Sequence, residues 1–366
     1  MRIICFLLLI IFPVLLNAQD RTQHIIPEKS NRQDQINKPY LILISADGFR
    51  LDLADMYMAK NLIRLRNSGV RSEYMLSVFP SLTFPNHYSI ATGKYPSHEG
   101  IVDNSFYDPN SKRFYNMGKD ILLKTVPGTA LHQYGFWQKN RVYSRPVLLS
   151  RCRSRIQGIR PTYYYKYNTF IPLNERIRVV RAWLASPESV RPPQITFYMP
   201  EVDPEEHIYG VNSKQTANAV YTVDKAVGQL VEAIDSLQLP VNYIFISDHG
   251  MINIDTSHTI SLPKAIDSIQ FMIMNSMSLT HLYSRDSAYI LPVYKQLKTE
   301  SFDYDVYLSI NLPPRWHYSK TEDFFNRTGD ILKINHAPKV FKFNNQHLSL
   351  ATHGFAPALS EMHATF

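Results

Sequence analysis

Three short apolar runs stand out along the chain, and each is rich in β-branched or aromatic residues. They are "YLILISADG" from Tyr40, "ITFYMPEVD" from Ile195 and "VNYIFISDHG" from Val241. None has the three-to-four-residue spacing of an amphipathic helix, so each is predicted to be a strand buried on both faces, as in a parallel sheet. Residues 212–237 do place apolar positions three and four apart, which predicts a helix between the last two strands.

Alternating strands and helices predict a single α/β domain over residues 40–366, with a mostly parallel central sheet and helices on both faces. Residues 20–39 form a polar segment ahead of it. Each predicted strand is followed by an aspartate: Asp47, Asp203 and Asp248. Because ligands bind beyond the carboxyl ends of the strands in such sheets, we expect these carboxylates to meet at one edge. There they would repel one another unless a positive charge lay between them.

Histidines accompany two of these aspartates. His207 lies four residues after Asp203, His249 directly follows Asp248, and His353 stands in "ATHGFAP". Aspartate and histidine together are typical zinc ligands, and imidazole disfavours magnesium and calcium. Two such ligand sets would suit a pair of metal ions about 4 Å apart. The alternative for any one aspartate is a helix cap, and for any one histidine an ordinary hydrogen bond.

The stretch "VFPSLTFPNHYSIATGKYP", residues 78–96, combines turn and helix signals. Proline is tolerated in the first turn of a helix, so Pro85 predicts a helix that begins near Thr83. Propensity alone makes Thr83 a helix cap. The alternative is a nucleophile, since a divalent cation can activate its hydroxyl and a helix N-terminus favours a phosphate.

Composition narrows the class of protein. The chain has 366 residues, 45% hydrophobic and 19% charged, which suits a globular protein with a sizeable core. The net charge of +8 is scattered, so we expect no stable binding of nucleic acid. Residues 1–19 have the pattern of a secretory signal peptide, with an uncleaved anchor as the alternative, and no later segment is apolar enough to span a bilayer. Cys152 has no partner outside the signal, and a periplasmic or secreted location is predicted.

Five segments resemble, in order and spacing, the nucleotide pyrophosphatase/phosphodiesterase family of the alkaline phosphatase superfamily. They are "SADGFR", "FPSLTFPNHYSIATGKYPSHEGIVDNSFYDP", "DPEEHIYG", "SDHGM" and "THGF". The resemblance covers nearly all of the chain from residue 40 onward. It implies an alkaline-phosphatase-like fold and a two-metal hydrolase of phosphodiester or pyrophosphate bonds. The metals would be two Zn²⁺ ions, with other divalent ions as the alternative, and the reaction would pass through a phospho-threonine.

The resemblance also implies roles for individual residues. One zinc would be held by Asp203, His207 and His353, and the second by Asp47, Asp248, His249 and the nucleophile Thr83. Asn104 would donate a hydrogen bond to a phosphate oxygen, and Phe84 and Tyr167 would sandwich a nucleobase. For Phe84 the alternative is an ordinary core position. A small phosphodiester or nucleotide is the expected substrate, but the same metals would serve a phospholipase-C-like diesterase or a phosphomonoesterase.

Two features depart from the family pattern. Residues 129–155 carry five arginines where the family has a tryptophan-containing strand, which indicates either a local reading-frame error or a real basic insertion. The family also continues well beyond Phe366, so the C-terminus is expected to be truncated. In addition, Ala356 stands where the family usually has an acidic residue. These departures motivate a hypothesis of another class, a catalytically impaired remnant. The sequence does not define the physiological substrate, the metal loaded or the oligomeric state.

Overall fold

The computed structural model describes residues 23–25, 30–31, 33, 36–116, 162–165, 168, 170–343 and 347–366. The predicted signal peptide, the atypical segment 129–155 and Tyr167 lie outside these residues. Within the described part of the chain, no helix combines the length and the apolar character needed to cross a membrane.

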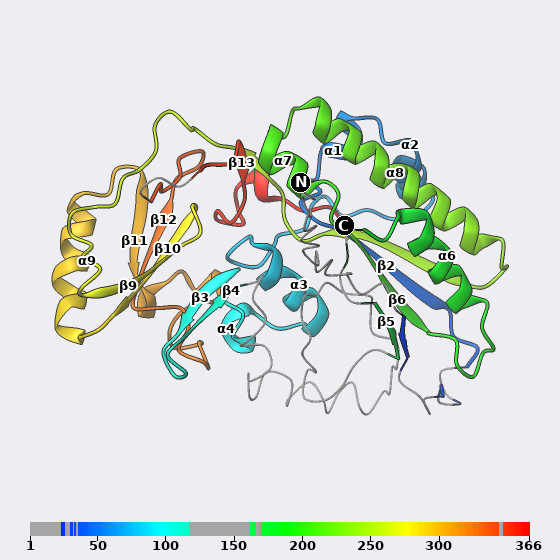
Figure 1. The fold of residues 1–366 in the computed structure, drawn as a ribbon, viewed down its shortest axis with the longest axis horizontal. Coiled ribbons are helices and arrows are strands. Elements are labelled where there is room, and N and C mark those ends of the chain that lie inside the picture. The colour runs from blue at the N-terminus through cyan, green and yellow to red at the C-terminus, as the bar shows by residue number, and fades with distance from the viewer. Residues whose placement is uncertain are drawn as a thin grey trace, which may run out of the picture.

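A three-stranded parallel sheet forms the right-hand half of the molecule in Figure 1. Its strands are β2 (Tyr40–Ala46), β6 (Gln194–Met199) and β7 (Val241–Ser247), in the order β6-β2-β7. All three predicted strands are therefore confirmed, as is their parallel direction. β7 differs from the prediction in burial, because only its last two residues are buried. Among the described strands it pairs with β2 alone, and the Ser247 N–H at its end donates to the Thr365 carbonyl oxygen at 3.0 Å.

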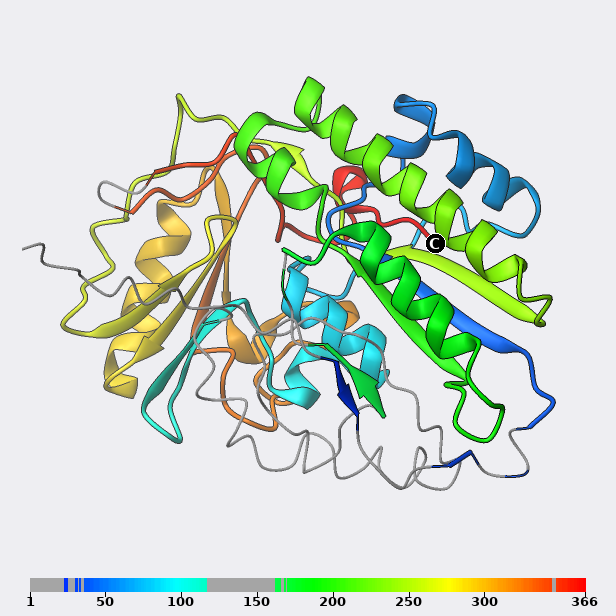
Figure 2. The same cartoon turned by 45° about the vertical axis from the view of Figure 1, so that its right-hand side comes forward.

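Helices cover both faces of this sheet. α2 (Lys60–Asn67), α6 (Leu173–Leu184) and α8 (Lys214–Asp235) lie in a row on one face, with α8 contacting the other two (Figures 1 and 2). Their apolar sides enclose Ile44, Phe197 and neighbouring strand residues in the main core. The helix predicted over 212–237 is thus α8, and the Ser213 side chain caps it by accepting from the Thr216 N–H.

α3 (Thr83–Thr92) lies against the opposite face of the sheet. Its His87 Nε2 is 3.0 Å from the Oγ of Ser45, and Ser45 alternates along β2 with the core residues Ile44 and Ala46. Since successive side chains of a strand point to opposite faces, α3 packs on the side away from the three helices. The predicted α/β class, with helices on both faces, is confirmed.

A four-stranded antiparallel sheet, not predicted from the sequence, occupies the left of Figure 1. It contains β9 (Phe271–Asn275), β10 (Leu279–Ser284), β11 (Tyr304–Leu308) and β12 (Ile331–Asn335), in the order β11-β12-β10-β9. α9 (Ile290–Thr299) packs on it over a separate apolar core.

The remaining elements are short: β1 (His24–Ile25), α1 (Leu53–Met56), α4 (Pro96–Glu99), β3 (Ser105–Asp108), β4 (Arg113–Asn116), β5 (Tyr163–Tyr164), α7 (Asp203–Tyr209), β8 (Ile252–Asn253), η2 (Ser287–Tyr289), η3 (Ser309–Asn311), η4 (Pro314–Trp316), β13 (Ala351–Thr352) and η5 (Ser360–Met362).

A fully buried lysine lies within this second sheet. The Nζ of Lys333 is 4.3 Å from the ring centroids of both Tyr304 and Phe341, and it donates to the Oδ1 of Asn335 at 2.9 Å. Burial lowers the pKa of Lys333 from its usual range near 10.5 to about 7. The folded protein therefore releases this proton at a lower pH than the unfolded chain does.

The buried amine makes stability depend on pH. Between about pH 7 and pH 10.5 the unfolded chain holds the Lys333 proton and the folded chain does not, so the free energy of unfolding rises with pH over this window. In Lys333→Met this contribution disappears, and the stability of the variant relative to wild type should fall steadily from pH 7 to pH 10. Urea unfolding at a series of pH values measures the difference. Parallel curves for the two proteins would contradict the expectation.

Candidate metal centre and phosphate site

Two of the predicted ligands directly follow strands of the parallel sheet. Asp47 comes after β2 and Asp248 after β7, as predicted. Asp203 is placed differently, because β6 ends at Met199 and Asp203 is the first residue of α7. Gly48, with φ +67°, allows α7 to come close: a Cβ at this position would lie only 3.0 Å from the Cβ of Asp203. The start of a helix therefore brings the third carboxylate to the strand ends.

All six predicted protein ligands meet in one cluster. Ligand atoms of Asp203, His249 and His353 lie within 4.8 Å of one another, and so do those of Asp47, His87 and Asp248. This grouping differs from the one implied by the resemblance. His249 lies between the two groups, with its Nε2 3.5 Å from Asp47 Oδ1 and 3.2 Å from Asp248 Oδ2. His207 Nε2 lies 3.4 Å from Asp203 Oδ1, at the edge of the first group.

The orientation of the three histidines suits metal binding. Each Nδ1 lies 2.8–2.9 Å from a backbone carbonyl oxygen: Ala351 for His207, Gly250 for His249 and Ser81 for His353. With Nδ1–H donating to the carbonyl, the lone pair of each Nε2 is available to the cluster. A ligating histidine is typically held in this way through its other ring nitrogen.

The carboxylates fit the same interpretation. Asp47 Oδ1, Asp203 Oδ1 and Asp248 Oδ2 are buried oxygens, and the described donors nearest to them are the imidazole nitrogens of the cluster, at 3.1–3.7 Å. In two of these carboxylates the other oxygen accepts a hydrogen bond. The Tyr198 hydroxyl donates to Asp47 Oδ2, and the Gly48 N–H donates to Asp248 Oδ1 at 3.1 Å. Leaving buried anionic oxygens unpaired is costly unless a cation pairs with them. The residues present therefore fit divalent metal ions.

The pKa values show how strongly these groups interact. Burial raises the pKa of Asp47 well above its usual range, and the neighbouring Asp248 and Asp203 add to the rise. Burial and the adjacent His249 lower the pKa of His353 to about 3, so its imidazole is neutral at pH 7. Burial opposes ionisation of Asp203 as well, but the adjacent His207 outweighs it and lowers that pKa to about 2. Asp203 and His353 therefore have the anionic and neutral-imidazole forms that a divalent cation requires, whereas the raised pKa of Asp47 favours a proton that a cation would displace.

Thr83 faces this cluster. α3 begins at Thr83, and the preceding Leu82 is the N-cap without any side-chain hydrogen bond to the helix. The Thr83 hydroxyl lies 3.1 Å from His249 Nε2, so it is directed at the ligands and does not cap the helix. The Phe84 N–H, in the same first turn, donates to Asn104 Oδ1 at 3.0 Å. This contact occupies the amide oxygen of Asn104 and leaves its Nδ2 group as the hydrogen-bond donor.

His87 belongs to the site but was not predicted. Its Nδ1 lies 2.9 Å from the carbonyl oxygen of Thr83 and 3.1 Å from Asp248 Oδ2. Its Nε2 contacts Ser45, as described above. A signal was available, since His87 comes four residues after Thr83 and such residues share one face of a helix. Its partners Ser45 and Asp248, however, are distant in the sequence.

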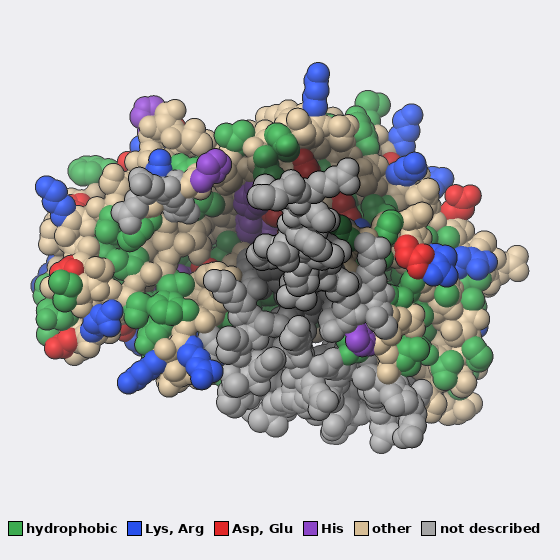
Figure 3. Space-filling view, viewed as in Figure 1, with side chains coloured by type: hydrophobic (Ala, Val, Ile, Leu, Met, Phe, Trp, Pro, Cys, Tyr) green, Lys and Arg blue, Asp and Glu red, His purple; other side chains and the backbone are tan. Residues whose placement is uncertain are grey.

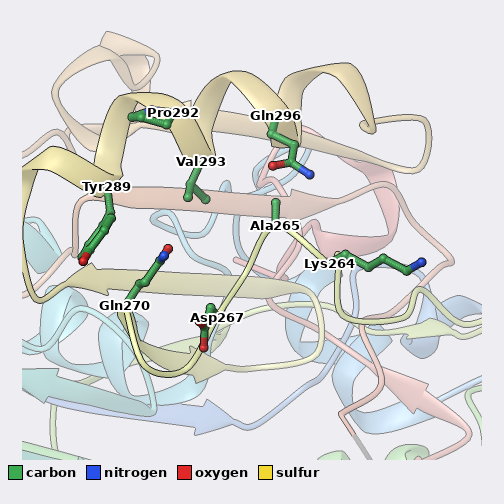
Figure 4. Close-up of a pocket in the computed structure, with 8 residues that line it drawn as sticks. All are labelled: Lys264, Ala265, Asp267, Gln270, Tyr289, Pro292, Val293 and Gln296. Atoms are coloured by element: carbon green, nitrogen blue, oxygen red, sulfur yellow. The ribbon is translucent and has the colours of Figure 1, made fainter.

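The predicted nucleobase clamp is only partly visible. Phe84 is 8% exposed and packs in a core cluster that includes Phe79 and Leu332, and Tyr167 lies outside the described residues. Figure 3 shows histidine side chains deep in the centre of one face, between the two sheets. A separate pocket between α9 and residues 264–270 is lined by Lys264, Gln270 and Tyr289 among others, and includes none of the predicted site residues (Figure 4).

An α/β fold with carboxylates, imidazoles and a helix-terminal hydroxyl at the ends of its strands matches solved structures of the alkaline-phosphatase-like fold. Murine ectonucleotide pyrophosphatase/phosphodiesterase 5 shares the fold, with a TM-score of 0.79, 24% identity and coverage of 89% of this chain and 87% of that one. Its human counterpart gives 0.78, with 23% identity and coverage of 89% and 87%.

Sequence comparison shows the family. Residues 41–356 match the type I phosphodiesterase/nucleotide pyrophosphatase family, and the chain belongs to it. Bis(5'-adenosyl)-triphosphatase ENPP4 of Bos taurus is 30% identical over 334 residues, covering 88% of this chain and 71% of the cattle protein. Venom phosphodiesterase 2 of Crotalus adamanteus is 30% identical over 304 residues, covering 76% of this chain and 36% of the venom protein. The family comprises metal-dependent hydrolases of phosphoester and anhydride bonds.

The contacts of His87 predict a measurable effect on metal affinity. In His87→Leu, the Asp248 carboxylate and the start of α3 lose a shared partner, and the affinity for Zn²⁺ should fall by about 10–100-fold. Competition with a chromogenic zinc chelator measures it. His258→Leu is the matched control, since His258 is exposed and pairs only with Asp255 among its described neighbours. If His87→Leu and His258→Leu bound Zn²⁺ with equal affinity, the predicted role of His87 would be wrong.

Proposed function

We propose that the chain is a two-zinc phosphodiesterase and nucleotide pyrophosphatase that forms a phospho-threonine intermediate on Thr83. The observation that carries the proposal is the position of the Thr83 hydroxyl. It stands at the N-terminus of α3, 3.1 Å from His249 Nε2 and inside a cluster of six acidic and imidazole side chains. A divalent ion that coordinated this hydroxyl would lower its pKa and so make it a nucleophile.

The cluster would hold the two metals. Asp203, His207 and His353 are proposed for one ion, and Asp47, Asp248, His249 and Thr83 for the other, as the resemblance implies. When bound, the ions would supply the positive charge that activates the hydroxyl and neutralises the charge of the phosphate.

The chain's own residues account for the rest of the reaction. The Thr83 oxygen attacks phosphorus in line and the leaving group departs with the electrons of its P–O bond. The Asn104 Nδ2 group donates to an equatorial phosphate oxygen, because its Oδ1 is already held by the Phe84 N–H. The dipole of α3, whose N-terminus lies at Thr83, adds positive potential at the phosphate. Water then attacks the phospho-threonine and releases Thr83 for the next cycle.

A nucleotide substrate is favoured by the names of the relatives. ENPP4 is named a bis(5'-adenosyl)-triphosphatase, and an inactive threonine-to-alanine variant of murine ENPP5 was solved in complex with AMP. In this chain Phe84 directly follows Thr83 and is the proposed stacking residue for the base, with Tyr167 as its partner. A secreted or periplasmic location is proposed from the predicted signal peptide, and it agrees with the extracellular venom relatives.

Hydrolysis of three nitrophenyl esters tests the proposal. The purified, zinc-loaded chain should hydrolyse 4-nitrophenyl thymidine 5′-phosphate and 4-nitrophenyl methyl phosphate faster than 4-nitrophenyl phosphate. Thr83→Ala should abolish turnover and keep the bound zinc, whereas Thr83→Ser should retain activity. Thr222→Ala is the control, because its exposed hydroxyl bonds only Asn218 O among described groups.

Each other outcome selects a different function. Faster hydrolysis of the monoester would indicate a phosphomonoesterase. If none of the three esters is hydrolysed but a choline-phosphate ester, assayed as a fourth substrate, is, the enzyme would be phospholipase-C-like. Two equivalents of bound zinc with no turnover of any ester would support the alternative that the chain is a catalytically impaired remnant. Activity that survives in Thr83→Ala would remove the proposed nucleophile.

Replacement of the aromatic ring at position 84 tests base stacking. Phe84→Leu keeps most of the packing volume of this buried side chain but removes the π face, and stacking contributes about 1–3 kcal/mol per base. KM for the thymidine ester should rise about tenfold, while KM for the methyl ester stays unchanged. Steady-state kinetics on the two substrates measures this, and an equal change for both esters would mean that Phe84 is only a core residue.

A further inference from the structure

The residue directly before Asn104 is anchored in the antiparallel-sheet half of the molecule. Asp103 is fully buried, and Ser276 Oγ lies 2.6 and 2.7 Å from its two carboxylate oxygens. His281 Nε2 is 3.2 Å from Asp103 Oδ2. Ser276 directly follows β9 and His281 lies within β10, so both partners come from one hairpin of the second sheet.

Two further contacts, from outside this hairpin, hold the backbone on either side of Asn104. Tyr318, between β11 and β12, is fully buried and donates from its hydroxyl to the Val102 carbonyl oxygen at 2.5 Å. Asp103 Oδ1 also accepts from the Ser105 N–H at 2.9 Å. The chain from residue 102 to 105 is therefore fixed on both sides of Asn104.

The β9–β10 turn also packs behind a predicted metal ligand. Gly354, which follows His353, has φ +93°, and a Cβ there would lie only 2.5 Å from Ser278 Oγ. Residues 276–278 thus contact two segments of the site: the one that carries Asn104 and the one that carries His353.

We propose that the β9–β10 turn is a positioning element of the active site, in which Ser276 and His281 act through Asp103 to hold the Asn104 amide against the substrate phosphate. This inference rests on the proposed phosphodiesterase function. Neither Ser276 nor His281 touches the reacting atoms, so both are positioning residues. A displacement of about 1 Å in a group that contacts the transition state costs about 100-fold in rate, which makes such support effective.

A double-mutant cycle tests the coupling in the zinc-loaded chain. Ser276→Ala should lower kcat on 4-nitrophenyl thymidine 5′-phosphate about tenfold, with KM nearly unchanged. In the Asn104→Ala background the same substitution should cause no further loss, because the group that it positions is gone. Ser284→Ala is the control on the same hairpin, since its hydroxyl donates to Asp286 O and points away from Asp103. Equal losses in both backgrounds would overturn the proposal.

A second measurement does not depend on turnover. The Phe84 N–H donates to Asn104 Oδ1, so its ¹H–¹⁵N resonance in protein labelled with ¹⁵N-phenylalanine reports the position of the Asn104 side chain. Ser276→Ala should shift this resonance and Ser284→Ala should not. An unshifted resonance would overturn the positioning role even in an inactive protein, whereas a shift without any turnover in wild type would refute only the proposed function.

Discussion

Mutual repulsion of three carboxylates is the constraint on which this structure depends. Asp47, Asp203 and Asp248 each direct a buried oxygen into one small volume, and burial together with the two neighbouring carboxylates raises the pKa of Asp47. Such an arrangement is unfavourable in a folded protein unless a cation compensates it. The surrounding structure maintains it nevertheless: parallel strands end there, Gly48 admits the start of α7, and backbone carbonyls turn three imidazoles toward the same point.

α3 is the element that joins this charged cluster to the phosphate chemistry. Its first residue directs a hydroxyl at His249, its second donates a backbone N–H to Asn104, and its fifth links Thr83 to Asp248 through an imidazole. All three contacts come from little more than one helical turn. The geometry of the proposed nucleophile, phosphate donor and metal ligand is therefore set by the placement of a single short helix against β2.

Local signals account for what the sequence predicted. The apolar runs before Asp47 and Asp248, the period of α8 and Pro85 in the first turn of α3 are local signals, and they predicted the correct elements. Long-range pairing accounts for what was missed. The strands of the second sheet are five or six residues long with no clear alternation, and Asp103, His281 and Ser276 become neighbours only in the folded chain. Asp203 was misplaced onto a strand end, although Pro200 directly after Met199 is a signal that the strand ends there.

The order of the ligands along the chain has a consequence for folding. The antiparallel sheet lies between His249 and His353 in the sequence, and the turn between β9 and β10 lies against Gly354, so the last ligand joins the cluster across a long loop that contains the whole second sheet. Contacts of this sequence separation form late, because loop closure must precede them. A metal captured by the finished cluster would therefore stabilise the docked sheet as well as the site. Metal supply during biosynthesis would then set the yield of folded protein, apart from any part it plays in turnover.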